Sequence, residues 1–219
     1  MDDRHVEARE TDAVVAAERP ELLILCGAMG ILGPVAFTVA TLVMQILVPN
    51  HDWMADTISD LGDGPMQIWM DCFFYLQGAG LIALAVAAAH AHLGRWGWSA
   101  GILMLTLLAL AIVLLGVWDE FYTRPDPPHL SVHTRIAITL LPLFTLGPLA
   151  MAAGAARVDE RYRGMFLASA ALWPVLALTY YFGPDGWDGL LERIAGAVTL
   201  LWTVPLGWMF LSRGLRKTG

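Results

Sequence analysis

The stretch 101-GILMLTLLALAIVLLGVW-118 decides the fold, because its eighteen residues include no charged side chain. An uncharged run of about 18 or more residues is long enough to cross a lipid bilayer as an α-helix. In lipid, a spanning segment must pair its own backbone groups, which leaves helices or closed barrels. Barrel strands are about ten residues long and alternate apolar with polar side chains, whereas this stretch is longer and does not alternate. It is therefore predicted to be a transmembrane helix.

Five more apolar blocks lie along the 219-residue chain. Together, the six blocks cover residues 22–48, 66–91, 97–118, 132–155, 164–182 and 191–211. Only 15% of the residues are charged, whereas about one-quarter are charged in a soluble domain. The connections between the blocks are too short to form a second domain. The predicted fold is therefore all-α: one polytopic six-transmembrane-helix bundle at residues 21–219, preceded by a polar cytoplasmic tail at residues 1–20.

The lysine and arginine residues indicate how this bundle is oriented. Ten of the 13 lie in the N-terminal tail, near the C-terminus or in the connections after the second and fourth blocks. Because loops rich in Lys and Arg stay in the cytoplasm, both termini are expected inside, in a multi-pass protein of the plasma membrane. Tryptophans near the block ends, including Trp96 and Trp98, are expected in aromatic belts at the membrane surfaces. The formal net charge of −7 and the lack of a basic cluster argue against nucleic acid and leave membrane lipids as the expected partners.

The connections on the opposite, outer side are acidic. The first of them, 51-HDWMADTISDLGDGP-65, contains four aspartates and no lysine or arginine. If this stretch is helical, Asp52, Asp56 and Asp60 share one face and repel one another. They would then need a cation, a shared proton or opposing arginines, and simple solvation is the alternative.

Asp71 is a second candidate for chemistry at this side. It lies about two turns inside the second block, roughly 9 Å from Pro65 at the helical rise. A carboxylate at this depth is energetically costly and usually faces the bundle interior with a partner. With Asp60 and His133, it is a candidate catalytic acid or base. The alternative is a hydrogen-bonded aspartate that only specifies helix packing.

His129 and His133 lie four residues apart in the motif HLSVH, at the start of the fourth block. Two histidines at this spacing on a helix can bind one metal ion. Catalytic zinc takes three protein ligands, and Asp119, Asp60 or His51 is a candidate for the third. The sequence therefore permits a zinc site. A hydrogen-bonded pair of histidines at the membrane surface is the alternative.

Arg135 and Arg193 lie just inside the fourth and sixth blocks, where an unpaired arginine is unfavourable. Their expected partners are Asp60, Asp71, Asp119, Glu120 and Glu192. The acidic stretch is therefore expected to fold back onto the bundle. With Ser59 and Glu192, the two arginines also form a candidate site for a lipid or other anion, because arginine holds phosphate through two parallel hydrogen bonds.

The order of these motifs resembles an uncharacterised family of six-helix prokaryotic membrane proteins, catalogued as domain of unknown function 998. The resemblance covers about residues 22–211 and rests most specifically on Ser59-Asp60-Leu61-Gly62, His133 and Glu192-Arg193. The chain departs from the family at Val117-Trp118-Asp119, where a phenylalanine-proline-type stretch is usual. The resemblance implies a six-helix fold and a polar outer cluster, and it implies no reaction.

Three functions stay open at this point. The first is binding of a lipid or other amphiphile at the outer cluster. The second is a lipid-modifying enzyme, either a metal-dependent hydrolase or an acid-catalysed terpene-cyclase-like enzyme, which uses Asp60 or Asp71 and His129 or His133. The third is a small proton-coupled transporter with Asp71 as its relay, although no inverted repeat is visible.

Overall fold

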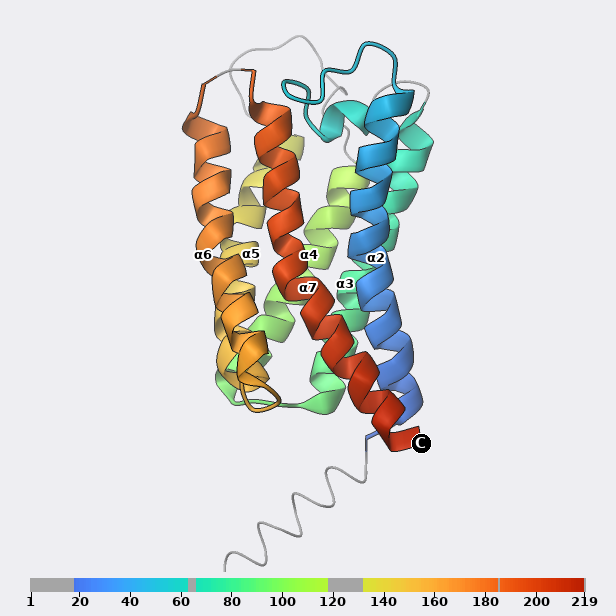
Figure 1. The fold of residues 1–219 in the computed structure, drawn as a ribbon, viewed down its shortest axis with the longest axis vertical. Helices are drawn as coiled ribbons and strands as arrows, with labels where there is room; N and C mark the ends of the chain where they lie inside the picture. The colour runs from blue at the N-terminus through green and yellow to red at the C-terminus, as the bar shows by residue number, and fades with distance from the viewer. Residues whose placement is uncertain (1–17, 63–65, 118–131, 185, 219) are drawn as a thin grey trace, which may run out of the picture.

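The computed structural model describes residues 18–62, 66–117, 132–184 and 186–218 (Figure 1). Its elements follow in the order α2 (Pro20–Leu47), η1 (Ser59–Gly62), α3 (Gln67–Ala91), α4 (Trp96–Val117), α5 (Val132–Ala155), α6 (Glu160–Phe182) and α7 (Asp188–Thr218). The α elements are helices long and apolar enough to cross a membrane, six in all, and η1 is a short 3-10 helix. Within the described residues, the predicted all-α fold with six long apolar helices is therefore confirmed, and these helices are consistent with a six-span membrane bundle.

The helices match the apolar blocks closely, except that α6 and α7 begin earlier and α7 also continues to Thr218, beyond the predicted end at residue 211. At α6, the side chain of Asp159 caps the helix by accepting a hydrogen bond from the backbone N–H of Arg161 at 2.8 Å. At α7, Asp188 lies in the first turn, where the helix dipole favours an acidic side chain. Hydropathy thus locates the apolar part of each helix, and polar caps extend it beyond that part.

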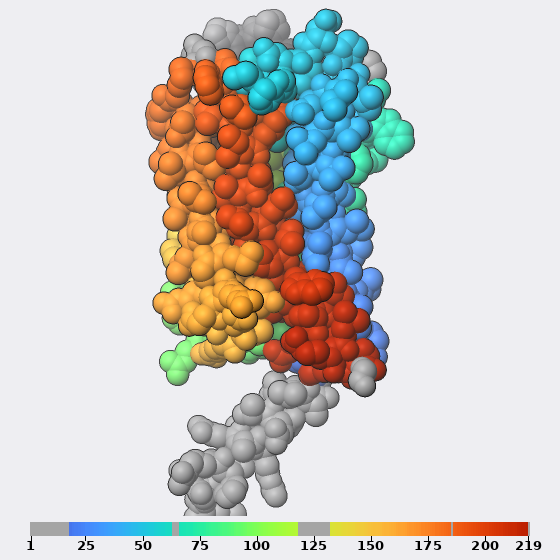
Figure 2. All heavy atoms as spheres, in the orientation of Figure 1, coloured from blue at the N-terminus to red at the C-terminus, as the bar shows by residue number. Residues whose placement is uncertain are grey.

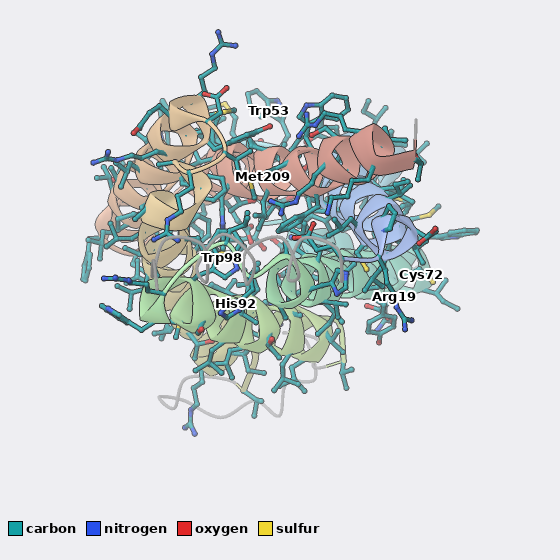
Figure 3. The ribbon with its side chains drawn as sticks, turned by 90° about the horizontal axis from the view of Figure 1, so that it is seen from below. Arg19, Trp53, Cys72, His92, Trp98 and Met209 are labelled. Atoms are coloured by element: carbon teal, nitrogen blue, oxygen red, sulfur yellow. The ribbon has the colours of Figure 1, made fainter. Side chains whose placement is uncertain are left out.

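The six helices form a closed ring. Each helix packs against its neighbours in the sequence, and α7 also packs against α2. Figure 3 shows this ring from below. The start of α2 and the end of α7 lie together at one end of the molecule (Figure 1), which we call the terminal end. The opposite end carries η1, and we call it the η1 end.

Close backbone contacts hold the ring together in the terminal half. A Cβ atom on Gly27 of α2 would lie 2.5 Å from the backbone nitrogen of Leu211 in α7. A Cβ atom on Gly97 of α4 would lie 2.9 Å from the carbonyl oxygen of Ala150 in α5. Between helices in lipid, the main attraction is van der Waals packing, which small residues strengthen by letting backbones approach.

A tryptophan fills the ring at the terminal end. Trp98 is 2% exposed, and its Nε1–H donates to the carbonyl oxygen of Ala88 at 2.8 Å. Its ring lies against Gly154 and 6.5 Å from the ring of Phe210, inside the bundle (Figure 3). The prediction that Trp98 belongs to an aromatic belt is wrong, because Gly154 leaves room for the indole between the helices. Trp96, which is 83% exposed, remains consistent with such a belt.

Candidate functional site

The aspartates of the connection after α2 bind the backbone of their own segment. Asp52 accepts a hydrogen bond from the N–H of Met54 at 3.0 Å, and Asp56 accepts one from the N–H of Asp52 at 2.8 Å. Asp60 accepts from both the N–H and the hydroxyl of Thr57. Aspartate favours such local bonds because its short side chain reaches nearby backbone groups. A helix that would place Asp52, Asp56 and Asp60 on one face is therefore not formed.

Arg193 of α7 anchors this connection to the bundle. Its Nε–H donates to Oε1 of Gln45 at 3.0 Å, and Nη1 donates to the carbonyl oxygens of Asp56 at 2.9 Å and Gly189 at 2.8 Å. Nη2 donates to Nε2 of His51 at 2.8 Å. These four bonds join the end of α2, the connection and the first turn of α7. The prediction that Arg193 is paired is confirmed, but its hydrogen-bond partners are neutral groups rather than carboxylates.

His51 is held in its neutral form by this arrangement. Its Nε2 accepts from Arg193, and its Nδ1 lies 3.6 Å from Oδ2 of Asp56. Burial lowers the pKa of His51 below its ordinary value, and the positive charge of Arg193 lowers it further, against the opposing effect of Asp56, Asp60 and Asp52. A second proton at Nε2 would face the N–H groups of the guanidinium, so the neutral ring is the form that fits.

The same connection lies against the start of α7 (Figure 2). The N–H of Leu190 donates to the carbonyl oxygen of Met54 at 3.1 Å. The N–H of Ile58 donates to Oε2 of Glu192 at 2.6 Å. Gly189 permits this approach, because a Cβ atom at that position would collide with the carbonyl oxygen of Asp56. The expectation that the acidic stretch folds back onto the bundle is therefore confirmed.

Ser59 and His133 meet where this connection joins the bundle. Ser59 begins η1 and His133 lies in the first turn of α5, and the structure places Oγ of Ser59 2.9 Å from Nε2 of His133. The histidine is buried. A serine hydroxyl hydrogen-bonded to an imidazole has the separation required for proton transfer between the two.

A cavity of about 230 Å³ opens from this pair into the centre of the ring. All six helices contribute to its mainly apolar wall. One residue from each, in chain order, is Pro34, Gln77, Leu115, Phe144, Trp173 and Thr199. Phe144 lies eleven residues beyond His133 in α5, which places it about 16 Å deeper along the helix.

A second cavity of about 120 Å³ begins at the same place. It extends along α5 and α6 to Tyr180 and Tyr181. The two cavities share six lining residues: Ser59, His133, Ala137, Leu140, Trp173 and Glu192. The Ser59–His133 pair therefore lies at the junction of two cavities, one central and one between the outer parts of α5 and α6.

Two residues that line the central cavity each have a buried polar atom without a hydrogen-bond partner among the described residues. They are Gln77, at Oε1, which is 6% exposed as a residue, and Trp173, at Nε1, which is 8% exposed. A buried polar atom without a partner is unfavourable by about 1–3 kcal/mol. The wall of the cavity therefore contains one unsatisfied acceptor and one unsatisfied donor.

The structure brings four of the predicted site residues together: Ser59, His133, Glu192 and Arg193 all line the central cavity. The others lie elsewhere. Asp60 directs its carboxylate to Thr57, half-buried Asp71 lines neither of these two cavities, and Arg135 is exposed. The functional roles assigned to these residues stay predictions.

The predicted zinc ligands His129 and Asp119 lie outside the described residues, as does Glu120. The part of the chain that the structure describes contains no group of three or more His, Cys, Asp or Glu side chains placed to hold a metal ion. The zinc prediction is therefore neither confirmed nor contradicted.

The sequence reasoning missed Gln77 and Trp173 as cavity residues. Gln77 carries the only signal that was available, an amide in the middle of an apolar block, where polar side chains are rare and tend to face the bundle interior. Trp173 carries none, because a mid-block tryptophan reads as packing between helices.

Comparison with known proteins identifies one family. The family described as "Protein of unknown function (DUF998)" matches residues 31–209. No curated protein matches the chain, and no solved structure matches it. The match includes η1, both sides of the cavity junction and every helix at least in part.

Proposed function

Since this chain belongs to DUF998, a family whose function is unknown, we propose from the geometry alone that it binds a lipid or other amphiphile in the central cavity. The apolar part of the ligand lies along the wall of the ring, and its polar end lies beside Ser59, His133 and Glu192. The volume of about 230 Å³ is close to the lower limit of roughly 300 Å³ for small-molecule pockets.

One observation carries this proposal: Gln77 and Trp173, whose Oε1 and Nε1 have no hydrogen-bond partner among the described residues, belong to the mainly apolar wall of the cavity. An occupant with a hydrogen-bonding group in its apolar part would satisfy them. Both atoms lie about 14 Å below the η1 end, since Gln77 is ten residues into α3 and Trp173 is nine residues before the end of α6. A hydroxyl or carbonyl group within an acyl or isoprenoid chain has the required chemistry.

Arg193 contributes positive charge to the proposed site and cannot also hold a lipid headgroup through several hydrogen bonds. Four of its five N–H donors are used in anchoring the connection after α2. A single remaining donor and a positive potential at the junction suit a neutral or weakly anionic polar group better than a bidentate phosphate. The ligand class proposed for Arg193 is therefore a neutral or weakly anionic polar group instead of any anion. Arg135 is exposed and is not part of this proposed site.

The η1 end is placed outside the cell in this proposal. The basic side chains Arg157, Arg213 and Lys217 lie at or near the ends of helices on the terminal side, which supports a cytoplasmic terminal end. The ligand is therefore a component of the outer leaflet or a molecule that enters through it.

The proposal is tested by native mass spectrometry of the full chain in detergent, before and after addition of oleic acid. Bound lipid or fatty acid is expected in the wild type. Ala137→Phe places a ring in the cavity wall and should abolish the complex. Ile138→Phe is the matched control, because Ile138 is the next residue of α5 and is exposed. Equal retention in both variants, or a wild type with neither lipid nor fatty acid bound, would overturn the proposal.

A further inference from the structure

We propose that Ser59 and His133 are the nucleophile and base of a hydrolase that cleaves a carboxylic ester joining two apolar groups. This inference rests on the proposed function, because it requires an amphiphile in the cavity. It goes beyond that function by assigning a reaction, a substrate class and a role to each residue.

The first step of the argument is the geometry of the pair. Oγ of Ser59 and Nε2 of His133 are 2.9 Å apart, although the residues are 74 positions apart in the sequence and belong to different elements. The serine hydroxyl can donate only to an unprotonated Nε2, which places the proton of a neutral ring on Nδ1. Nε2 is then free to accept the hydroxyl proton as the oxygen attacks.

The second step is the rigidity of the segment that carries the serine. Three bonds fix it just before η1: Arg193 to the carbonyl oxygen of Asp56, Thr57 to the carboxylate of Asp60, and the N–H of Ile58 to Glu192. A nucleophile is effective only when its distance and angle to the reacting carbon are held closely. Glu192 and Arg193 are therefore positioning residues in this proposal.

The third step is the arrangement of the two cavities. They share Ser59, His133 and Glu192 at the η1 end and Ala137, Leu140 and Trp173 further down, so they run side by side, one in the ring and one between α5 and α6. An ester whose carbonyl lies beside Ser59 has its acyl chain in the central cavity and its alcohol part in the second. A free fatty acid would need only one of these spaces, so the pair of cavities favours an ester as the substrate.

The reaction balances with water as the second substrate. Oγ of Ser59 attacks the ester carbonyl carbon while its proton passes to Nε2 of His133. The carbon–oxygen bond to the alcohol then breaks, and the alcohol leaves with the proton from His133. Water attacks the resulting acyl-serine and gives a proton to His133. The carboxylic acid leaves, and Ser59 takes back its proton. One ester and one water thus give one acid and one alcohol.

The alternative is that the Ser59–His133 bond only joins η1 to α5. A fluorophosphonate with an alkyl chain distinguishes the two, because it forms a covalent bond with an activated serine and not with a merely hydrogen-bonded one. In the full chain in detergent, the label is expected on Ser59 by peptide mass spectrometry. His133→Gln should slow labelling by at least about 100-fold, the usual contribution of a general base.

Ser169→Ala provides the control serine. Ser169 is also buried and hydrogen-bonded, but it donates to the backbone of Val198 and lines neither cavity at the junction. Labelling should be unchanged in this variant and absent in Ser59→Ala. The wild type should also release p-nitrophenol from p-nitrophenyl octanoate, and Ser59→Ala should not. Site mapping in the wild type keeps the test valid if Ser59→Ala does not fold.

The failure of this inference can be told from the failure of the proposed function. Bound lipid in the native mass spectrum together with an unlabelled Ser59 would overturn the hydrolase and leave lipid binding intact. No bound lipid and no label would overturn both. A label that persists in Ser59→Ala would assign the reactivity to another residue and would also reject the hydrolase.

Discussion

The two ends of the helix ring are built from the same six helices and differ in what lies between them. At the terminal end, Gly27 and Gly97 let neighbouring backbones touch, and Trp98 fills the space that remains. At the η1 end, the helices surround a cavity, and a connecting segment covers it. A hollow of about 590 Å³ also lies at the terminal end, but its lining comes from α4, α5 and the connections beside them and not from all six helices. The comparison teaches that small residues at the contacts, with one large side chain in the middle, decide whether the centre of such a ring is filled or hollow.

This difference assigns separate tasks to the two ends. A packed region with few polar groups contributes stability, whereas a cavity with unpartnered polar atoms lowers it. Sites that bind and react are commonly drawn from the less stable part of a protein. We therefore expect substitutions at the terminal end to change the free energy of unfolding, and substitutions at the η1 end to change ligand occupancy and reactivity more than stability.

The largest expected effect is that of Trp98→Ala. Removal of a fully buried indole leaves a cavity at the terminal end, and the free energy of unfolding should fall by about 3–5 kcal/mol. Thermal unfolding in detergent, followed by circular dichroism, measures the loss. Trp96→Ala is the matched control and should lie within about 0.5 kcal/mol of the wild type, because Trp96 is exposed. Equal effects of the two substitutions would remove the distinction between a filled and a hollow end.

A smaller effect compares one substitution at two glycines. Gly27→Ala should lower the free energy of unfolding by about 1–3 kcal/mol, because the new Cβ meets the backbone of α7, which cannot move alone. Gly196→Ala should be neutral or stabilising by up to about 1 kcal/mol, because nothing lies within 4 Å of its Cβ position. The same thermal measurement decides the sign at each site. A loss at Gly196 as large as that at Gly27 would show that the η1 half is packed as tightly as the terminal half.

The smallest effect concerns pH at the η1 end. The pKa of folded His51 is lowered, chiefly by burial, from its ordinary value of 6.5. Below pH 6.5 the unfolded chain binds a proton at this residue before the folded chain does, so stability falls as the pH drops towards the lowered pKa. Above pH 6.5 this residue adds no pH dependence, since it is neutral in both states.

The difference between wild type and His51→Gln isolates this contribution from those of Asp52, Asp56 and Asp60. Melting temperatures should decline less steeply in the variant between about pH 7.5 and about pH 5, a range that brackets the ordinary histidine pKa. The protection of residues 51–62 from hydrogen exchange, relative to the intrinsic rate at each pH, should fall with acidification in the wild type, while protection at the terminal end stays constant. A parallel decline in both proteins would mean that His51 does not couple protonation to the η1 end.

The sequence predicts the fold well because its signal is strong and local. A segment that crosses a bilayer is a helix unless it belongs to a closed barrel, so hydropathy alone locates all six helices. The polar starts of α6 and α7 lie outside that signal, because caps such as Asp159 are determined by single residues. The position of Trp98 also escapes prediction, since it depends on which glycine of another helix faces it.

The sequence predicts which residues form the site but not which of them contact one another. Ser59, His133, Glu192 and Arg193 are recognisable as polar residues beside apolar blocks, but their pairing depends on how each helix is rotated. Asp71 shows the limit of the rule for acids within membranes: it lies in the second turn of α3, as the sequence indicates, yet it lines neither of the two cavities at the junction. The aspartates after α2 show another limit, because long-range charge pairing was expected and short-range capping formed instead.

The buried indole of Trp98 at the terminal end bears on whether a molecule could cross the bundle. Trp98 and Phe210 pack against each other inside the ring at the terminal end, and neither lines the central cavity. The cavity is therefore open towards the η1 end and closed below. A ligand of the proposed kind would therefore enter and leave at the η1 end. Such an arrangement suits a protein that binds or converts the proposed ligand better than one that transports it across the membrane.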